Sequence, residues 1–214
     1  MKNYLITVLL ALLTCPNPLL AQDDASSKYS LQLDIGLLNT LHYNQPVSLN
    51  QCIEGCNPEN QDAKLASAFG LNLYRDIDSK NSLKIGFGLS SYRYDEIGQG
   101  GTGDDSSAAY QIANEWNFYS ISLGYRYIFN PEHQLGFFLE GDVIYELPTD
   151  DYTFIQSGLA VQPKIGAQLS INQKWNLIAE GLFKSALTNY SDKNFGKDYK
   201  PYAFGIQVGV NFSL

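Results

Sequence analysis

Few residues of this chain have the chemistry that catalysis requires. Its two histidines, His42 and His133, are the only imidazoles available for acid–base work near neutral pH. A hydrolytic site would need a nucleophile, a base and an orienting group within hydrogen-bond reach of one another. No motif in the sequence brings such a set together. The sequence therefore predicts a protein that is not an enzyme and that carries no cofactor.

Cysteines offer a second kind of chemistry. Cys52 and Cys56 lie four positions apart in a polar stretch, without a nearby histidine or further cysteine to complete a four-ligand metal set. No metal site is predicted, and the pair is instead expected to form a small loop disulfide, which suits an oxidising compartment.

A glycine-rich segment, residues 98–105, resembles a phosphate-binding loop only superficially. It lacks the lysine that such a loop carries and the helix that follows it. Asp104 and Asp105 would repel phosphate, and the dense glycines raise backbone entropy. The segment is predicted to be a mobile surface loop.

The first residues predict export. Residues 1–21 have a positive start at Lys2, a short apolar stretch and a small residue, Ala21, before the predicted cut, as in a secretory signal peptide. Cys15 leaves a lipoprotein signal open as an alternative. Residues 22–214 are then expected to form one domain. They hold 13 basic against 22 acidic residues, a net charge of −9, which disfavours nucleic acid as a partner.

The dominant pattern after the leader is an alternation of apolar and polar residues with a period of two, which predicts β-strands with one apolar face. No later stretch approaches the roughly 20 apolar residues of a membrane-spanning helix. The fourth strand could begin as early as residue 110, and Pro163 should mark a bulge or a strand end. The eight predicted strands are 28–41, 64–75, 82–94, 116–128, 134–147, 156–171, 174–187 and 202–214.

The connections between these strands alternate in length. Tight turns rich in Asn, Asp, Ser and Pro are predicted at 76–81, 129–133 and 172–173. Longer polar loops are predicted at 42–63, 95–109, 148–155 and 188–200. An antiparallel up-and-down barrel would gather all the long loops at one end and both termini at the other. His42 and His133 would then lie at opposite ends.

The composition of the two faces indicates which one is enclosed. Only 17% of the residues are charged, below the ~25% that is usual for soluble domains. The polar face is mainly Gly, Ala, Ser, Asn and Gln, as the crowded interior of an eight-stranded barrel requires. The apolar face is therefore predicted to contact lipid, with aromatic residues near both of its ends. The polar face also carries charges of both signs, expected to form an internal ion-paired network: Asp34, Lys84, Arg126, Glu140, Asp142, Glu146, Lys164, Glu180 and Lys184.

From residue 29 to the last residue the pattern resembles the eight-stranded outer-membrane β-barrels of Gram-negative bacteria, the OmpA-like and OmpX-like superfamily. The likeness is sharpest in the final strand, where the family usually closes on a terminal aromatic that the barrel-assembly machinery recognises. Here Phe212 lies two residues before a terminal Leu214. The resemblance implies an all-β, eight-stranded antiparallel transmembrane barrel in the outer membrane.

The resemblance also implies a structural or surface-interaction role through acidic extracellular loops. Expected partners are outer-membrane lipid and surface glycolipid, the latter through bridging divalent cations, while no surface ligand can be named. Two alternatives remain open at this point. One is a narrow passive pore, and the other is a secreted, soluble, lipocalin-like barrel that binds an apolar ligand inside.

Overall fold

The computed structural model describes five ranges of the chain, 29–44, 58–100, 108–149, 156–191 and 198–214. The predicted signal peptide, the alternative at Cys15 and the predicted disulfide between Cys52 and Cys56 lie outside these ranges. Within them, no helix is long and apolar enough to cross a membrane.

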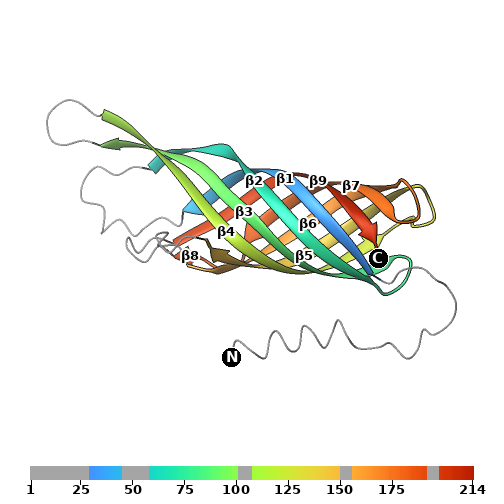
Figure 1. Ribbon diagram of the computed structural model, residues 1–214. Coiled ribbons are helices and arrows are strands. Elements are labelled where there is room, and N and C mark those ends of the chain that lie inside the picture. The colour runs from blue at the N-terminus through green and yellow to red at the C-terminus, as the bar shows by residue number, and fades with distance from the viewer. Residues whose placement is uncertain (1–28, 45–57, 101–107, 150–155, 192–197) are drawn as a thin grey trace, which may run out of the picture.

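Strands account for nearly all of the described chain (Figure 1). Each long strand pairs antiparallel with its neighbours along the chain, and β1 pairs with β9 to close the barrel. The two-residue β8 pairs only with β9, so the wall itself has eight strands, as predicted. The strands are β1 (Tyr29–Asn44), β2 (Pro58–Asp76), β3 (Asn81–Gly100), β4 (Ala108–Ile128), β5 (Leu135–Pro148), β6 (Gly158–Ser170), β7 (Trp175–Ala186), β8 (Tyr190–Ser191) and β9 (Asp198–Ser213).

Short turns define one end of the barrel, which we call the turn end. Asp78 accepts hydrogen bonds from the backbone N–H groups of Lys80 and Asn81 at 2.8 and 2.9 Å. Asn172 does the same for Lys174 and Trp175 in the turn between β6 and β7. Asx side chains stabilise turns in this way. The start of β1 and the end of β9 lie at the same end, and the opposite end is called the loop end (Figure 1).

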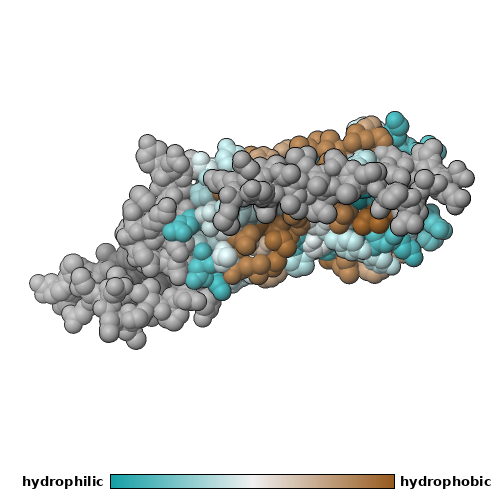
Figure 2. All heavy atoms as spheres, turned by 90° about the horizontal axis from the view of Figure 1, so that it is seen from below, coloured by the Kyte–Doolittle hydropathy of each residue, from teal (hydrophilic) through white to brown (hydrophobic). Residues whose placement is uncertain are grey.

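The wall turns its apolar side chains outward. In β5, exposed and buried residues alternate along almost the whole strand. The outward Ile35, Phe87 and Ile206 are 64, 52 and 65% exposed, and hydrophobic side chains gather over the barrel wall in Figure 2. A soluble protein rarely exposes a continuous apolar surface of this extent. The lipid-facing assignment is confirmed, and the soluble barrel with an apolar interior is wrong.

Aromatic residues on the outer face lie toward both ends, as predicted. Trp175 packs against Phe212 near the turn end, with ring centroids 4.7 Å apart. Toward the loop end, Phe87 stacks on Tyr119 at 6.2 Å. Trp175 and Tyr119, whose rings carry a polar group, suit the two interfaces of a bilayer.

Strands β2, β3 and β4 extend furthest past their predicted ends, and together they continue beyond the barrel wall. The pairing of β1 with β2 ends at Lys64, and the pairing of β4 with β5 ends at Phe118. Pairing of β3 with β2 and with β4 continues past both points. We call residues 58–63, 94–100 and 108–114 the projecting sheet (Figure 1). The prediction of loops throughout 42–63, 95–109 and 188–200 is therefore wrong, because strands beyond the apolar band need no lipid-facing side and so need not show the alternation of apolar and polar residues.

The projecting sheet begins at a β-bulge. Between Ala63 and Ala68, β2 carries one residue more than the facing part of β3. Buried Thr40 of β1 reaches across this interruption. Its hydroxyl accepts the N–H of Arg93 at 2.8 Å and donates to the carbonyl of the same residue at 2.5 Å. A side chain thus replaces the ladder bonds that the bulge removes.

Pro163 has a smaller effect than predicted. The ladder between β6 and β7 is interrupted between the pairs Val161↔Ser185 and Lys164↔Leu182. The two pairs are three residues apart on both strands, so the register is unchanged and the strand continues. Proline removes an N–H donor without forcing a bulge or a strand end here.

Candidate functional site

The interior of the barrel contains all nine charged residues that the sequence places on the polar face, and each is at least nine-tenths buried. They come from six strands, which alternate their side chains between lipid and lumen. The structure divides them into a turn-end cluster, a loop-end cluster and Asp34, which is linked to Arg126 through Gln32.

Glu140 is the centre of the turn-end cluster. Its carboxylate lies 2.7 Å from Lys84 Nζ, 2.6 Å from Arg126 Nη2 and 3.1 Å from Lys164 Nζ. Tyr74 donates its hydroxyl to the same carboxylate at 3.0 Å. One buried side chain of β5 therefore joins this strand to β2, β3, β4 and β6.

Two further carboxylates complete the turn-end cluster. Asp142 lies 2.7 Å from Lys84 and 3.4 Å from Lys164. Glu180 lies 2.9 Å from Lys164 and 3.8 Å from Arg126. Charges taken out of water require such close partners, because isolated burial is strongly unfavourable.

Aromatic rings hold the one buried guanidinium in place. Arg126 lies between Tyr74 and Phe138, with its Cζ atom 4.2 Å from each ring centroid. Phe138 in turn needs Gly166 beside it, because a Cβ at that position would overlap the ring. The cation–π contacts and the ion pair fix the guanidinium from three sides.

Glu146 is the centre of the loop-end cluster. It pairs with Lys184, and it accepts hydrogen bonds from Tyr92 at 2.8 Å, from Ser90 at 3.0 Å and from Tyr190. Because the carboxylate is the acceptor in each case, these hydrogen bonds are charge-assisted and stronger than hydrogen bonds between neutral groups.

Aromatic packing closes the lumen above Glu146. Tyr92, Phe118 and Tyr190 meet edge-on, with centroids 5.6 to 6.5 Å apart. They belong to a buried hydrophobic cluster that also contains Trp116. Gly158 makes room for Tyr190, since a Cβ there would overlap its ring. Together these side chains obstruct the loop end of the barrel.

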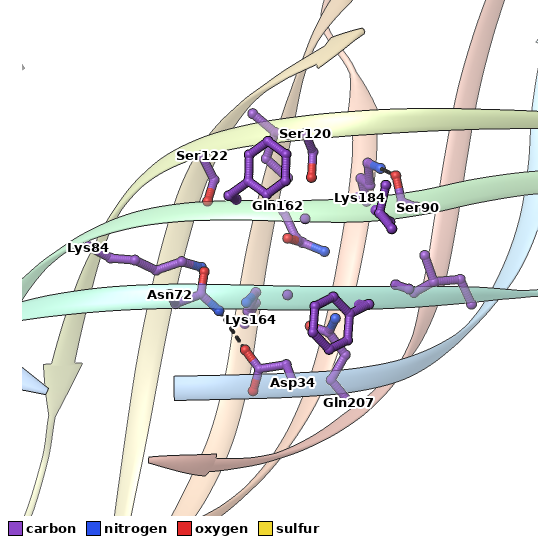
Figure 3. Close-up of a pocket in the computed structure, with 18 residues that line it drawn as sticks. Asp34, Asn72, Lys84, Ser90, Ser120, Ser122, Gln162, Lys164, Lys184 and Gln207 are labelled. Atoms are coloured by element: carbon purple, nitrogen blue, oxygen red, sulfur yellow. Dashed lines mark hydrogen bonds between the residues drawn. The ribbon is translucent and has the colours of Figure 1, made fainter. Parts of the chain in front are cut away.

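A cavity of about 50 Å³ lies between the two clusters (Figure 3). Glycines and serines of β2, β3 and β4 make the space, including Gly70, Gly88, Ser120 and Ser122. At roughly 10–15 Å³ for each water, the volume suits a few waters or a small ion. It is too small for a lipid tail or a metabolite of ordinary size.

The interactions described in this interior are ion pairs and hydrogen bonds, including those that join the Ser90 hydroxyl to Lys184 at 3.1 Å and to Glu146 at 3.0 Å. His42 lies in β1 toward the loop end, whereas His133 lies in the turn between β4 and β5. No group of three His, Cys, Asp or Glu side chains within the described ranges is arranged to hold a metal. The interior joins the strands to one another and obstructs the lumen.

Sequence reasoning missed the aromatic residues of the interior. Five of them occupy positions in phase with inward small residues, so the alternation of apolar and polar residues could have revealed them: Tyr74, Tyr92, Trp116, Phe118 and Phe138. Tyr190 could not have been found in this way, because it lies within the predicted loop 188–200, where the structure has β8.

Comparison with known proteins supports the fold. No protein-family model matches the chain, and no curated protein sequence is significantly similar to it. The structure of Neisserial surface protein A is similar over 89% of this chain and 100% of that one, with 10% identity and a TM-score of 0.51. The outer membrane protein OprG from Pseudomonas aeruginosa is similar over 87% and 95%, with 9% identity and a TM-score of 0.54. With its closed antiparallel wall, apolar outer face and charged interior, the chain has the fold of the eight-stranded transmembrane β-barrels of bacterial outer membranes.

Proposed function

We propose that this protein is exported by its signal peptide, lies in the outer membrane and acts there as a sealed, non-enzymatic barrel with a structural or surface-interaction role. The observation that carries the proposal is the combination of an apolar outer face with a lumen obstructed at two levels. The projecting sheet extends the loop end and offers a surface to other molecules.

Lumen geometry favours a sealed barrel over a passive pore. Eight strands enclose a space that side chains can fill, and here the Glu140 and Glu146 clusters each bring together residues from across the wall. The cavity between them is small. A continuous ion path would require both clusters to separate, which would leave buried charges without partners.

Three partners follow from the surface of the proposed protein. Outer-membrane lipid would cover the apolar band. Anionic surface glycolipid would be bridged through divalent cations to the acidic residues at the loop end, whose side chains lie outside the described part. During biogenesis, the barrel-assembly machinery would recognise the end of β9, where Phe212 pairs with Leu31 and Leu214 is exposed.

Two measurements test this proposal. Protease added to intact cells should cut within the loop end and leave the wall protected, which tests the membrane and the orientation. Planar-bilayer recording of the reconstituted chain should show no stable single-channel steps. Stable, ion-selective steps would contradict the sealed barrel and favour the pore.

A shortened variant tests the surface role separately. Residues 95–113 can be replaced by a two-residue Asn-Gly turn, because Tyr94 and Asn114 face each other across the hairpin. The variant should insert and fold like the unmodified chain, since the closed wall lies below this segment, but lose adhesion or glycolipid binding. As a control, a substitution confined to the turn at Asp78, at the opposite end of the barrel, should leave adhesion and glycolipid binding intact. Unchanged binding after removal of 95–113 would contradict a role for the projecting sheet.

A further inference from the structure

The projecting sheet has two outer edges, one formed by β2 and the other by β4 (Figure 1). Pairing of β2 with β1 ends at Lys64. Pairing of β4 with β5 ends at Phe118, and the last backbone hydrogen bond between these segments runs from Thr149 N–H to the Asn117 carbonyl at 2.9 Å. Beyond these points, no strand within the described ranges lies along the outer side of β2 or β4. Unpaired backbone groups of an edge strand can pair with another chain.

The β2 edge is protected against such pairing. Residues 58–63 begin with a proline and carry two carboxylates, Glu59 and Asp62. The register of β2 also shifts between Pro58 and Asn60. Proline, charged residues and bulges are the means by which proteins keep edge strands from pairing with other chains. The β2 edge therefore does not suit the addition of a strand.

The β4 edge has none of these protections. Residues 108–114 contain no proline and no charged residue, and β4 pairs with β3 without a register shift along its whole length. Asn117 directs its backbone groups toward β5, because its carbonyl accepts the Thr149 N–H. The direction of the backbone groups alternates from one residue to the next along a strand. The residues that present N–H and C=O groups on the open side are therefore Ala109, Gln111, Ala113 and Glu115.

The projecting sheet is acidic. It contains no Lys, Arg or His, and its four carboxylates are Glu59, Asp62, Asp95 and Glu96. The register of β2 and β3 places Asp62 directly opposite Asp95. Lys64 and Arg93 lie at the base of the sheet, and Arg93 is paired with Glu115 at 2.8 Å. A surface of one charge sign attracts partners of the opposite sign and repels those of its own.

We propose that the open edge of β4 binds an extended, cationic segment of another polypeptide, which joins the projecting sheet as an additional strand. Backbone hydrogen bonds hold the added strand, and its Lys or Arg side chains are attracted to the acidic sheet. A second copy of this chain fits less well, because it would bring the same four carboxylates. The inference rests on the surface-interaction role proposed above and names the class of partner for it.

The first experiment measures peptide binding to the full chain reconstituted in phosphatidylcholine vesicles, whose lipid has no net charge. The probe is a fluorescent peptide of alternating Lys and Thr, which is cationic and contains a residue that favours strands. Ala113→Pro removes an N–H group from the open edge and none from the ladder to β3, so it should weaken binding about tenfold. Ala113→Val keeps this N–H and should bind like the unmodified chain. Both variants should unfold in urea like the unmodified chain, and a peptide of alternating Glu and Thr should not bind.

A second measurement needs no variant. Amide hydrogen exchange in the unmodified chain should be fast at Gln111 and Ala113, whose N–H groups lie on the open edge. It should be slower at Ile112, whose N–H points toward β3. Addition of the Lys-Thr peptide should slow exchange at Gln111 and Ala113, because an added strand would accept hydrogen bonds from both.

Equal peptide binding by Ala113→Pro and Ala113→Val would overturn the addition of a strand at this edge. So would a failure of the Lys-Thr peptide to bind the unmodified chain. Slow exchange at Gln111 and Ala113 without peptide would overturn it too, because this chain itself would then cover the edge. A dimer of barrels that Ala113→Pro disrupts would replace the proposed partner with a second copy. If removal of residues 95–113 still abolished adhesion in any of these cases, the surface role would stand and only the addition of a strand would fail.

Discussion

Replacing Glu140 with Gln tests whether the interior is sealed from water. The exchange keeps the size of the side chain and removes one negative charge from among three cations. Lys84 and Lys164 keep Asp142 within 3.4 Å. Arg126, in contrast, keeps only the more distant Glu180, at 3.8 Å. We therefore expect the guanidinium to become the most poorly compensated charge.

The burial of the cluster sets how much stability Glu140→Gln should lose. Removing one partner of a buried ion pair typically destabilises the folded protein by about 3–5 kcal/mol, because the remaining charge stays out of water. All members of the cluster have side chains that are 4% exposed or less, so the full range applies. Since 1.36 kcal/mol corresponds to a factor of ten, the unfolding equilibrium constant of Glu140→Gln should rise by more than roughly a hundredfold.

Urea unfolding in lipid vesicles provides the assay. Trp175, exposed on the lipid face, reports insertion through its fluorescence. Glu115→Gln is the control, since the side chains of Glu115 and Arg93 are 43 and 48% exposed and their ion pair should contribute little. If Glu140→Gln changed stability no more than this control, the cluster would be in contact with water and the sealed lumen would be refuted.

Three further perturbations test other parts of the structure. Ile206→Lys places a charge on the lipid face and should destabilise the barrel by about 2–4 kcal/mol in the same assay; no loss would argue against lipid contact there. Gly158→Ala should displace the Tyr190 ring and destabilise by about 1–3 kcal/mol, but should have little effect in a Tyr190→Ala background, as a double-mutant cycle would show. Hydrogen bonds from Asn81 lower the pKa of Asp78 below its ordinary value of 3.8. Ionised Asp78 therefore stabilises the fold at pH values above 3.8, and this stabilisation is lost as the pH falls through the lowered pKa. The loss of stability caused by Asp78→Ala should accordingly become smaller in acid.

Much of the wall could be predicted from local patterns. Alternation along the last strand, from Tyr202 to Leu214, predicts its lipid-facing side, and the structure agrees at Phe204, Ile206 and Val208. Turn positions could be predicted because Asp and Asn in short polar stretches make local hydrogen bonds, as Asp78 and Asn172 do. Both signals depend only on residues close together in the sequence.

The candidate site could be predicted only as a set of residues. The alternation of apolar and polar residues along each strand identifies the nine charged side chains that point inward, but it does not show which of them form ion pairs with one another. Lys84 and Glu140 are 56 positions apart, and their contact depends on how strongly the strands are staggered around the barrel. The link from Asp34 through Gln32 to Arg126 depends on the same stagger.

Sequence by itself determined the strand number, the direction in which each side chain points and the presence of both charge signs inside, because a period of two is a property of each strand alone. Only the tertiary structure decided the projecting sheet, the bulge spanned by Thr40, the insertion of Tyr190 and the pairing of the charges. These features arise from contacts between strands that are distant in the chain. Their positions follow from the closure and stagger of the barrel, which no single strand encodes.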